Sequence, residues 1–119
     1  MDIEKSREIL RILRVFNPWW GAGKIENVES FKRLDFFAIK KRLDDTEIVT
    51  LVGARQVGKT TMMEQLVEHL LTVEAPKKIF FIRADNAGLN AISKSPIEES
   101  LQVYQEYELA DGSYTTFAI

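Results

Sequence analysis

Two short apolar runs with a helical pattern between them dominate the hydrophobic pattern of the chain. The runs at 47–52 and 78–83 are rich in β-branched and other apolar residues, which predicts buried strands of a parallel sheet. Residues 59–71 predict a helix with a single apolar stripe, made by Met63, Leu66, Val67, Leu70 and Leu71. A strand, a helix and a second strand make a right-handed βαβ unit. The pattern therefore predicts an α/β fold with a parallel sheet and flanking helices.

Helical patterns lie on both sides of this unit. Residues 2–16 predict a helix with a broad apolar side, and residues 31–43 predict another, with Ser30 as its N-cap. A turn is predicted at residues 111–113, and residues 114–119 begin a third strand.

A fourth helix is predicted to start at Ser95 and to run to about residue 109. Ser95 is expected to be the N-cap, Pro96 the first helical residue and Glu98 the partner in a capping box. The residues expected to face inward are Ile97, Leu101 and Tyr104.

The first predicted helix ends at Asn17-Pro18-Trp19-Trp20-Gly21, because a proline cannot continue a helix and restricts the residue before it. Two adjacent tryptophans in a turn could form a docking surface or stack on a nucleic-acid base. The favoured interpretation is that they clamp the N-terminal segment onto its own domain. The following Gly21-Ala22-Gly23-Lys24 has a glycine–lysine pattern but neither the spacing nor the preceding strand of a phosphate loop.

Composition narrows the function classes. The chain has 119 residues, a net charge of −2, no cysteine and one histidine, which excludes disulfides and thiolate metal sites and disfavours histidine metal clusters. No apolar run approaches the ~20 residues of a membrane span, and no signal peptide is recognised, so no membrane partner and a cytoplasmic location are expected.

Basic residues gather in two places. Arg7, Arg11 and Arg14 share a helix face, and residues 32–42 are the most basic segment. Both could attract nucleic acid. For the arginine face, the favoured interpretation is a solvated surface balanced by acidic neighbours. For residues 32–42, a solvated helix surface explains the charge as well as nucleic-acid binding does.

The strongest chemical signal lies between the first strand and the helix that follows it. It has the pattern G-x-x-x-x-G-K-[ST], the Walker A phosphate-binding loop, and the residues expected to contact nucleotide are Gly53, Ala54, Arg55, Gln56, Val57, Gly58, Lys59, Thr60 and Thr61. Glycines let backbone N–H groups point at phosphate, and the loop runs into the positive end of a helix.

Individual side chains of this loop have distinct expected roles. Lys59 is a mobile cation suited to the β- and γ-phosphates, and the Thr60 hydroxyl is the expected Mg²⁺ ligand. Thr61 could reach another phosphate oxygen or be an ordinary first-turn threonine. Arg55 could touch a phosphate or be solvated. Asp85, after the second strand, could orient the metal, but a turn residue is the favoured interpretation because Arg83 and Ala84 interrupt the pattern.

Taken with the Asn-Pro-Trp-Trp element and the basic segment, the loop GARQVGKTT resembles bacterial and archaeal AAA-type P-loop ATPases. The resemblance covers the chain from about Asn17 onward. It implies ATP and Mg²⁺ as cofactors, and an N-terminal P-loop domain followed by a C-terminal domain of poorly defined function. In the family an acidic Walker B pair follows the third strand, and this chain ends within that strand, so an incomplete P-loop NTPase-type domain is expected.

Two domain segments and two functions follow as expectations. Residues 1–30 are expected to form an N-terminal helical arm and residues 31–119 the front portion of the ATPase domain. The expected function is nucleotide binding through the loop, with ATP hydrolysis in the intact protein and little turnover by these residues alone. The alternative is a non-hydrolysing nucleotide-binding or interaction module. A homo-oligomer and a nucleic-acid partner are weaker expectations, and the catalytic residues are unassigned.

Overall fold

Three parallel strands form the sheet that is seen in the described part of the chain, in the order β1–β3–β2. The computed structural model describes residues 2–30, 32, 37, 40–41, 48–50, 59–109, 112 and 114–118. The strands are β1 (Ile48–Thr50), β2 (Ile79–Ile82) and β3 (Thr115–Ala118). Phe117 of β3 is aligned with Val49 on one side and with Phe81 on the other. The predicted parallel sheet is therefore confirmed.

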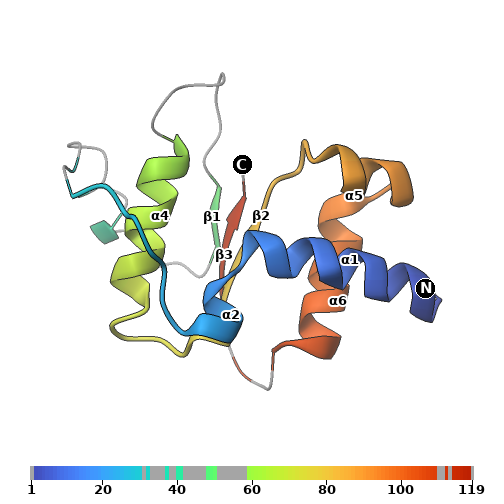
Figure 1. Cartoon of the computed structure of the whole chain (residues 1–119), viewed down its shortest axis with the longest axis horizontal. Coiled ribbons are helices and arrows are strands. Elements are labelled where there is room, and N and C mark those ends of the chain that lie inside the picture. The colour runs from blue at the N-terminus through green and yellow to red at the C-terminus, as the bar shows by residue number, and fades with distance from the viewer. Residues whose placement is uncertain are drawn as a thin grey trace.

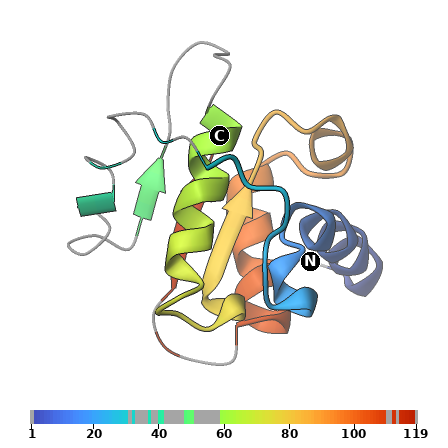
Figure 2. The same cartoon turned by 60° about the vertical axis from the view of Figure 1, so that its left-hand side comes forward.

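Helices cover both faces of this sheet. Helix α4 (Lys59–Leu70) lies on one face and α6 (Pro96–Tyr107) on the other (Figure 1, Figure 2). Helix α4 buries Met63, Leu66, Val67 and Leu70, as the apolar stripe predicted, while Leu71 follows the helix and is partly buried. The α/β fold with flanking helices is the observed one.

The N-terminal segment packs against the α6 side of the molecule. Helix α1 (Ile3–Phe16) contacts α6, β2 and the short helix α5 (Ala87–Ile92), and it buries Ile9, Leu10 and Leu13. The Asp2 side chain caps α1 by accepting from the Lys5 backbone N–H at 2.7 Å. A turn then leads into α2 (Trp19–Ala22), which lies beside the 3₁₀ turn η1 (Pro76–Lys78).

Helix α5 follows the turn that contains Asp85, in a region where the sequence predicted no helix. The Asn86 side chain accepts a hydrogen bond from the Leu89 backbone N–H at 2.9 Å and thereby starts the helix. Asparagine is common both in turns and at helix N-caps, so the local pattern did not separate the two. Leu89 is fully buried, which gives this short helix its tertiary anchor.

The start of α6 also differs from its prediction. Ser95 makes no side-chain cap; instead its backbone N–H donates to the Ser93 hydroxyl oxygen at 3.2 Å, and that hydroxyl is hydrogen-bonded to the Glu99 carboxylate. Ser95 is the N-cap and Pro96 lies at the first position, as predicted, but the side-chain bond of a capping box is replaced by the Ser93 hydroxyl, which accepts from the Ser95 N–H. Of the residues predicted to face inward, Tyr104 is fully buried and Leu101 partly buried, whereas Ile97 is exposed.

Most of the predicted helix at 31–43 lies outside the described residues, as do positions 51 and 52 of the first predicted strand.

Candidate functional site

The Walker A sequence joins β1 to α4, and these are the elements that such a loop connects. Strand β1 ends at Thr50 and α4 begins at Lys59. The described residues do not include six of the predicted contact residues between them, namely Gly53, Ala54, Arg55, Gln56, Val57 and Gly58. Thr60 and Thr61 belong to the first turn of α4 and are partly buried. The first-turn N–H groups of a helix lack intrahelical partners and favour an anion.

Strand order determines which residues approach this loop. Strand β3 pairs directly with β1, whereas β2 lies on the other side of β3. The strand end that lies next to the loop is therefore the carboxyl end of β3. Asp85 follows β2, lies in a turn and approaches Arg83 with 3.9 Å between Nε and Oδ1. This position favours the turn interpretation of Asp85 over a metal-orienting one.

A cavity of about 490 Å³ lies beside the first turns of α4. Its wall is mostly apolar and includes Phe16, Trp19, Met63 and Phe81, together with Thr60 and Glu64 of α4. The rings of Phe16 and Phe81 meet edge-on with centroids 6.2 Å apart. Burial against this wall raises the pKa of the Glu64 carboxyl above its ordinary value. Nothing in the sequence pattern indicated this cavity, because residues 16–26 and α4 are far apart in the chain.

The Asn-Pro-Trp-Trp element closes the outer edge of β2. The Asn17 side chain accepts from the Phe81 backbone N–H at 2.7 Å and donates to the Phe81 carbonyl at 2.9 Å. The indole N–H groups of Trp19 and Trp20 both donate to the Ile79 carbonyl, at 3.0 and 2.7 Å. Trp19 is 1% exposed and Trp20 7%. The interpretation that these residues clamp the N-terminal segment onto its own domain is confirmed.

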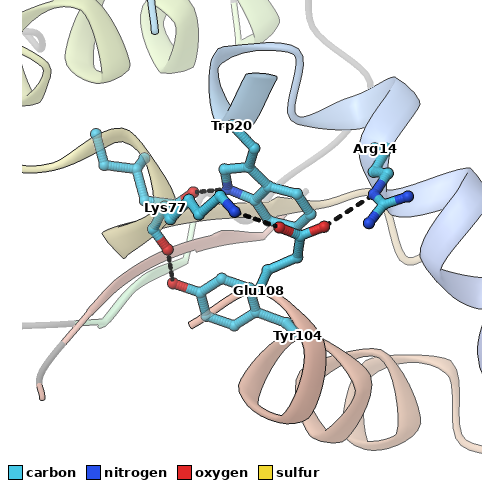
Figure 3. Close-up of polar contacts among 6 residues, drawn as sticks. Arg14, Trp20, Lys77, Tyr104 and Glu108 are labelled. Carbon is cyan, nitrogen blue, oxygen red and sulfur yellow. Dashed lines mark hydrogen bonds and ion pairs between the residues drawn. The ribbon is translucent and has the colours of Figure 1, made fainter. Parts of the chain in front are cut away.

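A group of aromatic and charged side chains supports this clamp (Figure 3). The Trp20 ring stacks on Tyr104 with centroids 5.3 Å apart, and the Tyr104 hydroxyl donates to the Lys77 carbonyl at 2.5 Å. The Glu108 side chain is 5% exposed and accepts from Arg14 at 2.8 Å, with the Lys77 ammonium 3.4 Å from its other oxygen. The group therefore joins α1, α2, η1 and the end of α6.

The basic and glycine-rich candidates of the N-terminal segment have structural partners. Arg11 pairs with Glu8 at 2.8 Å on the exposed face, as the solvated-face interpretation expected, while Arg14 is bound to Glu108. In the Gly21–Lys24 stretch, Gly23 ends α2 with a φ of 75°, and Lys24 pairs with Glu26 at 3.2 Å. These contacts leave no sign of a second phosphate loop there.

The described part of the chain contains no group of three or more histidine, cysteine, aspartate or glutamate side chains placed to hold a metal ion. It also contains no helix long and apolar enough to cross a membrane.

Comparison with known proteins places the chain in a family. A family model described as "AAA domain" matches residues 45–117, which is more than half of the chain. An uncharacterized protein of Methanocaldococcus jannaschii, MJ1637, is 27% identical over 81 residues, covering 63% of this chain and 16% of that protein. The chain thus spans about one sixth of the length of this relative. No solved structure matches the chain significantly. From the match over residues 45–117, the chain belongs to the AAA domain family, whose domains are of the nucleotide-binding, ATPase type.

Proposed function

We propose that the chain binds MgATP through residues 53–61, as the front part of an AAA-type ATPase. The observation that carries the proposal is the placement of the Walker A sequence between a strand of a parallel sheet and the N-terminus of α4. A phosphate loop in this position would present backbone N–H groups to an anion, and so would the helix N-terminus that follows it. Family membership supports the same assignment.

The residues present suit the nucleotide and its metal. Lys59 would neutralise the β- and γ-phosphates, and the Thr60 hydroxyl in the first turn of α4 would be a Mg²⁺ ligand. Mg²⁺ keeps several waters and uses phosphate oxygens as further ligands, so a single protein hydroxyl is a sufficient anchor. Bound metal would supply charge neutralisation at the phosphates.

Hydrolysis needs further groups beside the γ-phosphate, namely one that orients the attacking water and one that stabilises the developing charge. The second candidate function is a module that binds nucleotide without hydrolysing it. Comparing MgATP binding with MgATP turnover separates the two, because substantial turnover by these residues would exclude the second.

Removal of the loop lysine tests the site itself. Lys59→Ala is expected to weaken MgATP binding by about ten- to a hundredfold, because charged hydrogen bonds contribute about 1.5–3 kcal/mol. Titration calorimetry on the full chain measures this. Lys24→Ala, in the second glycine–lysine stretch, is the matched control and should leave the affinity unchanged. Equal affinities of wild type and Lys59→Ala would show that the loop is not the nucleotide site.

The same proposal extends to the organisation of the protein. Residues 31–119 are proposed as the front portion of the ATPase domain and residues 1–30 as the segment that precedes it. Assembly into a homo-oligomer and a cytoplasmic location are further proposals that follow from the family assignment.

A further inference from the structure

The cavity beside α4 has a chemical character that nucleotide binding does not use. Aromatic rings from three separate segments line it: Phe16 at the end of α1, Trp19 in α2 and Phe81 in β2. Met63 adds a flexible apolar wall. A volume of about 490 Å³ lies within the range of pockets that hold small organic ligands.

The charged residues of the cavity leave one negative charge without compensation. Lys24 at the rim pairs with Glu26 at 3.2 Å, so these two charges balance. Glu64, one turn after Thr60, also lines the cavity, and within the described residues its carboxylate has neither an ion pair nor a hydrogen bond. A carboxylate held partly out of water without a partner is costly, and a cationic ligand would remove that cost.

Aromatic side chains and a carboxylate together form an environment that organic cations prefer. The electron-rich ring faces attract a cation, and the carboxylate supplies the counter-charge. A purely apolar ligand would leave Glu64 unpaired, and an anionic ligand would be repelled by it. The charge of the cavity therefore selects the ligand class.

We propose that this cavity is a binding site for a small organic cation, an amine or guanidinium carried on an apolar body. The apolar body packs against Phe16, Trp19 and Met63, and the cationic group pairs with Glu64. Because Thr60 lies in the same wall, the site adjoins the Walker A helix. The proposal does not rest on nucleotide binding, since the residues proposed to hold the ligand, Phe16, Trp19, Met63 and Glu64, lie outside residues 53–61.

The test uses 2-phenylethylammonium as the probe and 3-phenylpropionate as an anion of similar shape. Binding to the full chain is followed by NMR of the methionine methyl groups and the tryptophan indole N–H groups. The Met63 methyl and the Trp19 indole signals should shift saturably with the cation and not with the anion. Met62, the neighbouring methionine outside the cavity wall, is the internal control.

Variants locate the binding to the cavity. Glu64→Gln should weaken binding of the cation by at least about tenfold, because it removes the counter-charge. Glu68→Gln, on the exposed side one turn further along α4, should have no effect. If Glu64→Gln does not fold, Ala22→Leu provides a second variant, because a larger side chain in the cavity wall should block the probe. Binding of the anion as tight as that of the cation, unchanged cation affinity in a folded variant, or no Met63 shift would each overturn the proposal.

Discussion

Tyr104 shows how one side chain connects several parts of this fold. Its ring is fully buried between Phe80 and Trp20, with centroid distances of 4.6 and 5.3 Å, and its hydroxyl donates to the Lys77 carbonyl. The hydroxyl can donate only while it is protonated. Burial is the main reason that the pKa of the Tyr104 phenol is raised far above its ordinary value, and the nearby Tyr114 and Glu108 add to the shift.

This raised pKa predicts a loss of stability at alkaline pH. An unfolded tyrosine ionises near pH 10, while the folded Tyr104 stays neutral, so the unfolded state loses a proton that the folded state keeps. The stabilisation is complete below pH 10 and declines above it by up to about 1.4 kcal/mol per pH unit. Tyr104→Phe should reduce this slope in urea unfolding between pH 9 and 11. Tyr107→Phe, at an exposed position, should keep it, and equal slopes in all three chains would contradict the prediction.

Some individual residues were predictable from the sequence and others were not. The stripe from Met63 to Leu70 followed from helical spacing, because burial of one helix face leaves a local signature. The ion pair of Arg14 with Glu108 joins residues 94 positions apart and leaves no such signature. For the same reason the sequence indicated the loop at 53–61 but not the cavity beside it.

At the level of elements, the edge of β2 is closed by side chains rather than by another strand. The carbonyl of Ile79 receives both indole N–H groups, and the amide of Asn17 bonds both backbone groups of Phe81. The Ile79 backbone N–H is used by the Pro76 carbonyl. A strand edge with free N–H and C=O groups invites pairing with another chain, and this arrangement removes those groups from use.

The shared acceptor of the two indoles predicts non-additive effects. Trp19→Phe or Trp20→Phe alone removes one donor, but the other indole still satisfies the Ile79 carbonyl. Each single change should therefore cost little beyond the lost ring area. The double variant leaves the carbonyl unsatisfied, and its loss should exceed the sum of the single losses by about 1–3 kcal/mol. Chemical denaturation of the four chains gives this coupling, and strict additivity would argue against a shared acceptor.

Elements with a strong local period were predicted more accurately than those set by tertiary contacts. The two runs around the loop became β1 and β2, and the segment between them became α4. Helix α5 was not predicted, because Asn86 suits a turn as well as a helix N-cap. The N-cap of α6 was predicted at Ser95, but the hydrogen bond from its backbone N–H to the Ser93 hydroxyl was not.

For the whole molecule, the N-terminal segment acts as one side of the core. It covers the β2 edge and packs on α5 and α6, while α4 covers the opposite face (Figure 2). The sheet order places the Walker A sequence next to β3, and the cavity beside α4 brings Thr60 into the same wall as Trp19 of the N-terminal clamp.

Loss of Asn17 should therefore affect the whole molecule. Asn17→Ala leaves the Phe81 N–H and carbonyl without their partner, which should lower the free energy of unfolding by about 3 kcal/mol and expose a pairing edge. Sedimentation velocity should show concentration-dependent self-association of this variant. Asn90→Ala removes exposed hydrogen bonds to Ala84 and Asn86 and is the control, expected to remain like the wild type. A monomeric, fully stable Asn17→Ala chain would contradict the role of the clamp.

The distance in sequence between the clamp and β2 also sets a delay during synthesis, between the translation of the clamp residues and that of the strand they bind. Trp19 precedes its acceptor Ile79 by 60 residues. At about 5–20 residues per second, translation takes roughly 3–12 s to cover that separation. During this interval two large indole rings and the Asn17 amide have been made, but the backbone groups they bind have not. The N-terminal segment therefore cannot form its clamp until β2 has been synthesised. A nascent chain that stalls before residue 79 carries an apolar segment that chaperones can recognise.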